Sequence, residues 1–132
     1  MVDANIYRWP LRVYIEDTDA GGIVYYVNYL KFLERARTEF MRSHGYGKRF
    51  IAEQGLMFVV HSLEAKFIKP ATLDDELEVS VEVFKIAKAS IVFKQSIWCD
   101  STLMFTASIK VACVDVAALK PKAIPLELVK AL

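Results

Sequence analysis

The chain has few residues that interrupt secondary structure or form disulfides, since its 132 residues include five glycines, four prolines and two cysteines. So little glycine and proline leaves no linker to divide the chain, and we expect residues 1–132 to form one domain. Cys99 and Cys113 have no CxxC spacing, which argues against a disulfide framework or a zinc centre. We expect both to be small buried thiols.

An excess of charge of one sign is also missing, because 17 basic residues face 16 acidic ones. A nucleic-acid-binding protein would show a basic excess, so no nucleic-acid partner is expected. No apolar run approaches the roughly 20 residues that span a membrane. The first ten residues carry Asp3 and Arg8 in place of a signal-peptide stretch. These absences favour a soluble, cytoplasmic protein with no transmembrane segment.

What the chain does contain is regular hydrophobic periodicity. A helical stripe runs from Tyr26 to His44, and Gly45 follows where a left-handed C-cap is wanted. The stripe comprises Tyr26, Tyr29, Leu30, Leu33, Ala36, Arg37, Phe40 and Met41. Alternation predicts strands over Tyr7–Glu16, Phe58–Ile68, Leu77–Val83, Ser90–Cys99 and Leu103–Val114. Short helices are expected over Lys48–Gln54 and Leu126–Ala131.

This order predicts an α+β fold in which a five-stranded antiparallel sheet wraps around one long helix. A helix of about 18 residues is roughly 27 Å long, so it covers one face of the sheet and leaves the edges open. Open strand edges pair readily with another chain. We therefore expect at least a homodimer.

The densest polar cluster is the loop Asp17–Gly22, which holds two acids and two adjacent glycines before the helix. One reading is a capping turn, in which the carboxylates accept backbone N–H bonds and complement the helix dipole. An EF-hand loop fails at Gly21 and Asn28, the fifth and twelfth positions of a loop starting at Asp17. A phosphatase DxD nucleophile needs a parallel sheet, which the strand order excludes. No metal site is expected.

A fourth reading assigns the loop to acyl transfer or hydrolysis. Free N–H groups at a helix start polarise a carbonyl, and a nearby aspartate attacks it or takes a proton from water. A thioester suits this geometry because its leaving group needs no acid. Other hydrolase motifs are missing, since there is no GxSxG and no triad pattern around His44 or His61. We expect His44 to complement the helix end and His61 to pack in the core or at an edge.

The stretch VYIEDTDAGGIVYYVNYL, residues 13–30, resembles the signature of the hot-dog-fold acyl-CoA thioesterases. The similarity is to the 4-hydroxybenzoyl-CoA thioesterase type and, within it, to the YbgC-like, Tol-Pal-associated group. Weaker similarities extend it along essentially the whole chain, over Glu34–Glu39, Lys69–Ala71, Leu73–Asp75, Ser90–Phe93, Cys113–Asp115 and Lys120–Pro121.

The resemblance implies hydrolysis of acyl-CoA, with a short-chain aliphatic or aromatic acyl group, to the free acid and CoA without a cofactor. It also implies a hot-dog dimer with one continuous sheet, often paired into a tetramer, and an active site at the dimer interface. The alternative is a non-catalytic hot-dog protein that binds acyl thioesters or docks a partner. Acyl carrier protein and Tol-Pal components are candidate partners that the residues themselves do not identify.

By position, the resemblance implies that Asp19 is the catalytic carboxylate and that Asp17 is not. The backbone N–H of Tyr26 matches the group that polarises the thioester carbonyl. Many YbgC-like sequences have histidine where this chain has Tyr26, which removes a candidate proton shuttle. Whether Asp19 acts as nucleophile or as general base stays open.

The resemblance places further residues at the substrate. Glu34 matches an acidic position that meets the acyl group, and its alternative is an exposed ion pair with Arg35 or Arg37. Lys85 and Lys88, expected in the turn before the fourth strand, match basic contacts to the CoA phosphates, and their alternative is to solubilise that turn. The implied substrate-binding set is Gly22, Val24, Tyr25, Glu34, Lys85, Lys88 and Ser90.

Overall fold

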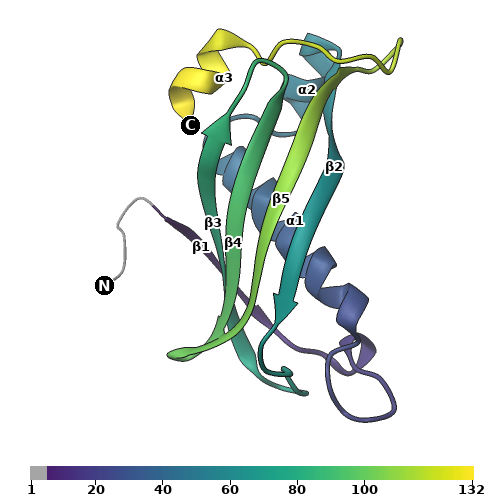
Figure 1. Cartoon of the computed structure of the whole chain (residues 1–132), viewed down its shortest axis with the longest axis vertical. Coiled ribbons are helices and arrows are strands. Elements are labelled where there is room, and N and C mark those ends of the chain that lie inside the picture. The colour runs from purple at the N-terminus through teal and green to yellow at the C-terminus, as the bar shows by residue number, and fades with distance from the viewer. Residues whose placement is uncertain (1–5) are drawn as a thin grey trace.

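The computed structural model describes residues 6–132, with the side chains of Lys48, Phe50 and Ile51 left out; Asp3 lies outside these described residues. The strands curl around the long helix α1 (Figure 1). This is the α+β hot-dog arrangement expected from the sequence, which is confirmed. The elements are β1 (Tyr7–Arg12), the 3₁₀ turn η1 (Ile15–Asp17), α1 (Tyr26–Ser43), α2 (Lys48–Gln54), β2 (Leu56–Phe67), β3 (Glu76–Ile86), β4 (Ser90–Cys99), β5 (Thr102–Asp115) and α3 (Leu126–Ala131).

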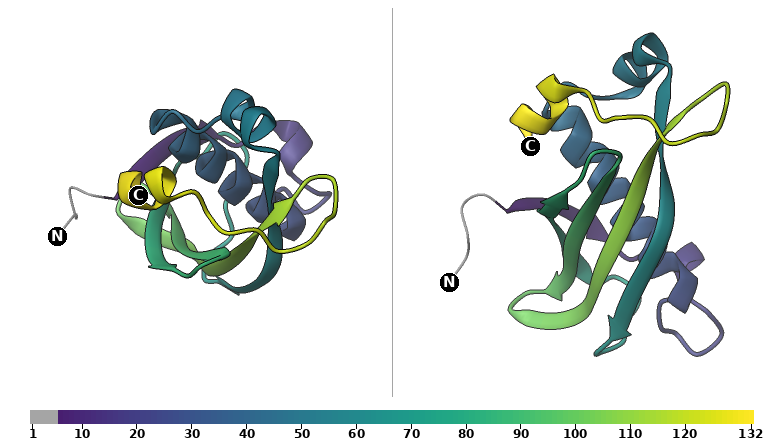
Figure 2. Two further views of the ribbon diagram at one scale, coloured as in Figure 1. Left: turned by 90° about the horizontal axis from the view of Figure 1, so that it is seen from above. Right: turned by 45° about the horizontal axis from the view of Figure 1, so that its top comes forward.

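The five strands form one antiparallel sheet in the order β1-β3-β4-β5-β2. Hairpins join β3 to β4 and β4 to β5, while β1 and β2 form the two edges. Asp100, at φ 53°, lies in the tight turn between β4 and β5. Seen from above, the sheet curves around α1 (Figure 2). No helix among residues 6–132 has the length and apolarity needed to cross a membrane.

The first strand is shorter than the predicted Tyr7–Glu16 because the chain curls after Arg12. The Asp17 carboxylate accepts the N–H of Tyr14, and the Asp17 N–H donates to the Tyr14 carbonyl. Such local polar contacts compete with a sheet ladder. They turn the chain into η1 and leave Ile15 77% exposed, so the strand prediction was wrong there.

The helix prediction is confirmed at both ends, and Gly45 follows α1 at φ 84° in the left-handed region. The predicted buried stripe was too narrow, because the sheet wraps around more than one side of the helix. Phe32, outside that stripe, is 1% exposed, whereas Tyr26 within it is 58% exposed. The buried helix residues are Tyr29, Phe32, Leu33, Ala36 and Phe40.

The predicted positions of the two cysteines and two histidines agree only in part with the structure. Cys113 is buried as expected, but Cys99 is only half-buried, and desolvation raises the pKa of each thiol. His61 is exposed at a bulge of the edge strand β2, so of the two predicted places, core or edge, the core is wrong. His44 caps α1 and contacts the Phe40 ring with centroids 4.8 Å apart.

Tyr29 joins the start of α1 to the segment before β3. Its buried hydroxyl oxygen accepts the Ala71 N–H at 2.9 Å, and its ring stacks on Phe105 with centroids 5.1 Å apart. Burial raises the pKa of Tyr29, so the phenol stays protonated. The contact fixes the helix start against the sheet.

Replacing Tyr29 with Phe should lower the free energy of unfolding by about 1–3 kcal/mol, because a buried N–H loses its acceptor. Urea unfolding monitored by circular dichroism measures the change. Tyr14→Phe is the matched control, since that tyrosine is 60% exposed. Equal loss of stability in both variants would contradict this role for the Tyr29 hydroxyl.

Candidate active site

The loop between η1 and α1 closes on itself as a small hairpin. Thr18 and Val24 form a β-bridge, and the Asp19 N–H donates to the Ile23 carbonyl at 2.9 Å. Gly22 makes the turn at φ 80°, a conformation that glycine adopts without the cost that other residues meet. A bridge between Ile23 and Thr72 ties the loop to the segment before β3.

Asp17 shapes this loop from inside. Its side chain accepts the Tyr14 N–H, and its backbone carbonyl accepts the Tyr25 N–H at 2.9 Å and the Asn28 side-chain amide at 2.8 Å. The N-cap of α1 is Tyr25, which makes no side-chain capping bond. Asp17 accepts the Tyr14 N–H and closes a capping box at η1, and Asp19 accepts the Gly21 N–H, so the predicted capping turn is present but does not cap α1.

Asp19 differs from Asp17 in its exposure. One carboxylate oxygen accepts the Gly21 N–H at 2.9 Å, and the other has no hydrogen-bond partner within residues 6–132. A Cβ at Gly21 would lie 3.2 Å from the bonded oxygen, so glycine leaves room for this carboxylate. Asp19 thus presents a free, oriented oxygen to solvent next to the start of α1.

The first amides of α1 face the same region. The Tyr25 and Asn28 N–H groups are bonded to backbone carbonyls, but those of Tyr26 and Val27 meet no acceptor in the described part of the chain. Such amides carry the positive end of the helix dipole. They can therefore bind a carbonyl oxygen or an oxyanion.

Aromatic rings surround this helix end. The Tyr26 ring lies 5.0 Å from the Tyr25 ring and 6.3 Å from the Phe67 ring, centroid to centroid. A small pocket of about 170 Å³ opens here. Its lining comprises Ile23, Val24, Tyr26, Tyr29, Phe67, Ile68, Lys69 and Pro70.

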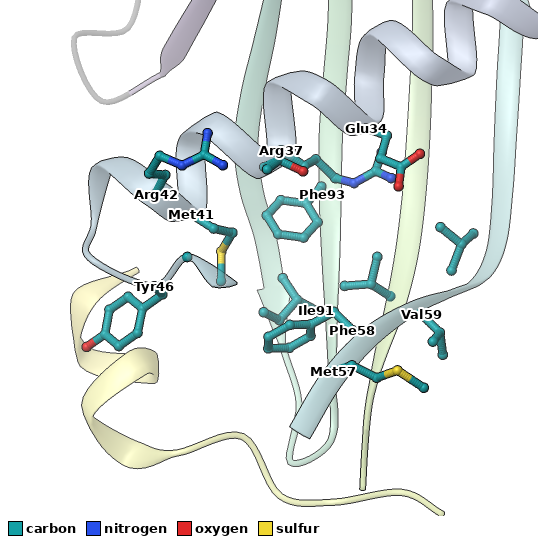
Figure 3. A pocket seen from close by; sticks show the side chains of 14 residues that line it. Glu34, Arg37, Met41, Arg42, Tyr46, Met57, Phe58, Val59, Ile91 and Phe93 are labelled. Carbon is teal, nitrogen blue, oxygen red and sulfur yellow. The ribbon is translucent and has the colours of Figure 1, made fainter. Parts of the chain in front are cut away.

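A larger pocket of about 550 Å³ lies between the C-terminal half of α1 and the start of β2 (Figure 3). Glu34 and Arg37 project into it from α1, above apolar side chains of β2 and β4. Glu34 forms no ion pair with Arg35 or Arg37 within 4.0 Å in the residues the structure describes, so that alternative is not observed. The apolar lining comprises Met41, Met57, Phe58, Val59, Val60, Ile91, Phe93 and Val111.

The implied site residues fall into separate groups within one chain. The helix-start group comprises Asp19, Gly22, Val24, Tyr25 and Tyr26. Glu34 lies further along α1. Lys85, Lys88 and Ser90 lie at the β3–β4 hairpin, at the opposite end of the sheet from the Asp19 loop (Figure 1). Lys85 is within β3 and not in the turn, because the strand continues past a bulge to Ile86.

Most residues that line these pockets were not predicted as site residues, and Arg37 and Phe67 are among them. A signal for Arg37 existed, since a cation on an otherwise apolar helix stripe needs a partner or a ligand. Phe67 had no such signal, because a phenylalanine in a strand is ordinarily a core residue.

Fold and loop together define a hot-dog protein with a carboxylate at the open start of its central helix. Residues 13–132 match the Thioesterase-like superfamily, and the chain belongs to that family. Its relatives include the acyl-CoA thioester hydrolase YbgC of Escherichia coli O6:H1, 41% identical over 129 residues, which are 97% of this chain and 96% of that protein.

Two further comparisons agree. The acyl-CoA thioesterase YbgC of Haemophilus influenzae is 44% identical over 93% of this chain and 91% of its own length. A probable thioesterase from Bartonella henselae has a solved structure with a TM-score of 0.86 and 32% identity. That match covers 91% of this chain and 99% of the other.

Proposed function

We propose that the protein hydrolyses acyl-CoA thioesters to the free acid and CoA, with Asp19 as the catalytic carboxylate. Two observations carry the proposal: Asp19 has a free carboxylate oxygen in the loop that leads into α1, and the amides of Tyr26 and Val27 at the start of α1 are unbonded within the described residues. The names of the YbgC relatives, acyl-CoA thioester hydrolase and acyl-CoA thioesterase, support this substrate class.

In the proposed reaction the thioester carbonyl oxygen accepts the Tyr26 N–H, and negative charge that develops on it is held at the helix start. Asp19 then attacks the carbonyl carbon, forming an anhydride that water opens, or removes a proton from the water that attacks. In either route the carbon–sulfur bond breaks and CoA leaves as a thiolate. The negative charge of Asp19 is required in both.

A second copy of the chain completes the site in this proposal. The edge strand β2 has core-facing side chains that α1 leaves uncovered: Val60, Leu63 and Phe67 are 50%, 40% and 54% exposed. Unpaired edges and exposed apolar faces favour association. Antiparallel pairing of β2 with the β2 strand of a second copy would bury the strand edge and its apolar side chains in a two-fold dimer. Two such dimers can pair again into a tetramer.

This pairing also explains why the implied residues are separated within one chain. The Asp19 loop lies at the Phe67 end of β2, and the large pocket lies at the Met57 end. An antiparallel twin would place the loop of one copy beside the pocket of the other. The β3–β4 hairpin is at the pocket end too, so Lys85 and Lys88 of the second copy would meet the CoA phosphates.

We further propose that the protein acts in the cytoplasm. Cys99 and Cys113 are free thiols, and a reducing compartment keeps cysteines in that state. Acyl-CoA substrates are made in the same compartment.

Asp19→Asn should lower kcat by at least about 10²-fold, the scale expected for loss of a catalytic base or nucleophile. Asparagine can still accept the Gly21 N–H, so the change removes charge and keeps the loop. Thiol release from a panel of acyl-CoAs measures turnover. Asp17→Asn is the control and should be milder, because that side chain only accepts the Tyr14 N–H. Near-wild-type turnover of Asp19→Asn would favour a binding protein instead.

Leu63→Glu should dissociate the dimer and abolish activity, because it buries a charge in the proposed apolar interface. Light scattering should give two or four times the 15.0 kDa chain mass for the wild type and half of the wild-type mass or less for the variant. Lys66→Glu, in the same strand with its side chain exposed, should stay dimeric. A fully active wild-type monomer would refute the two-copy site.

Replacing Lys85 and Lys88 together with Ala should raise KM for acyl-CoA more than it lowers kcat. Charges that hold the nucleotide act equally on ground and transition states. The effect should shrink as salt rises, because exposed charges are screened. The double variant of Lys94 and Lys110, exposed on β4 and β5, is the control. An unchanged KM at low salt would remove Lys85 and Lys88 from the site.

A further inference from the structure

Two arginines of α1, Arg37 and Arg42, line the large pocket together with Glu34, Thr38 and many apolar side chains. Arg42 pairs with Glu39, whereas Arg37 is held by a buried side chain. Arg37 Nη1 donates to Gln95 Oε1 at 2.9 Å. Gln95 is 1% exposed, and its Nε2 donates to the Leu33 carbonyl of α1 at 3.1 Å. Because the amide is held through both its nitrogen and its oxygen, its oxygen is directed at Arg37. A buried strand residue thus fixes the direction of a pocket-lining guanidinium.

Most of the hydrogen-bonding capacity of Arg37 remains unused. A guanidinium carries five N–H donors, and the bond to Gln95 is its one hydrogen bond within residues 6–132. The pocket wall around it includes the apolar side chains of Met41 and Phe93 as well as the charged Glu34 and Arg42 (Figure 3). Burial lowers the pKa of Arg37, and the nearby Glu34 offsets part of that effect. The group stays charged because the pKa of a guanidinium is very high. An acyl group lying in the pocket would displace water from these donors.

We propose that Arg37 is a specificity-determining residue that receives a neutral oxygen, hydroxyl or keto, carried by the acyl group beyond its thioester carbonyl. Gln95 is the positioning residue that orients it. The inference rests on the proposed thioesterase function. A site built to hydrogen-bond a substrate oxygen rejects the analogue that lacks it, because its donors lose their water without replacement. Glu34 lines the same pocket and would repel an acyl carboxylate.

The test compares kcat/KM for hexanoyl-CoA, 3-hydroxyhexanoyl-CoA, 5-hydroxyhexanoyl-CoA, 5-oxohexanoyl-CoA and adipoyl-CoA. The wild type should prefer at least one neutral oxygenated substrate over hexanoyl-CoA by about tenfold or more, and adipoyl-CoA should not share the gain. Arg37→Met should reduce the ratio to about one, and Arg37→Lys should restore part of it. Arg35→Met, an exposed neighbour on the same helix, is the control and should keep the wild-type ratio.

The variant Gln95→Leu tests the orientation of Arg37 separately from its charge. It keeps Arg37 but removes its orienting acceptor, so the ratio should fall while thermal unfolding shows a folded protein. Equal kcat/KM for all five substrates in the wild type would overturn this inference and leave the proposed function standing. A uniform rise of KM in Arg37→Met, with weaker inhibition by free CoA, would assign Arg37 to the nucleotide and also overturn it. No thiol release from any acyl-CoA would overturn the proposed function and this inference together.

Discussion

The structure depends on a mismatch in width, because one long helix is too narrow to cover the inner face of a five-stranded sheet. Within residues 6–132, α1 is the one long helix, and the sheet around it has five strands. The helix covers the inner face from β1 to β5 and leaves β2 with exposed apolar side chains on the same face. The exposed apolar side chains of β2 favour pairing of this edge strand with another chain. The same lack of cover leaves the space beside α1 in which the large pocket lies.

Within one chain, the Asp19 loop and the large pocket lie at different places along α1. The Asp19 loop is anchored where the helix begins, through the Tyr29 hydroxyl and the Ile23–Thr72 bridge to the segment before β3. The large pocket is lined by α1 residues from Glu34 to Arg42, which lie roughly 12 to 24 Å along the helix from Tyr26 by the rise per residue. A twin strand running antiparallel along β2 is the simplest arrangement that brings the two together. The proposed assembly is therefore a requirement of the site as well as of the sheet edge.

Most of the fold could be predicted from the sequence, because its signals are local. The alternation around Leu77–Val83 and the Gly45 stop after α1 each depend on a few neighbouring residues, and both agree with the structure. The prediction failed where contacts between distant parts of the chain determine the burial of a residue, or where a side chain determines the end of a strand. The extent of the wrapping sheet buries Phe32, and the side chain of Asp17 ends β1 early.

The site was predictable only in part, for the same reason. The motif around Asp19 is contiguous in sequence, so its loop could be located from the residues alone. Arg37 and Gln95 are 58 positions apart and meet only in the folded chain, so no local pattern joins them. The lysines of the β3–β4 hairpin lie at the far end of their own sheet, and only a second copy gives them a role at the loop.

Subunit mixing tests the two-copy site most directly. One variant, Asp19→Asn, lacks the carboxylate, and another, Thr38→Trp, fills the pocket that Thr38 lines. Each should be inactive alone. In a mixed dimer, the intact loop of one copy would face the intact pocket of the other, so an equal mixture should recover about a quarter of wild-type activity. No recovery after confirmed subunit exchange would contradict the account, because loop and pocket would then belong to the same chain.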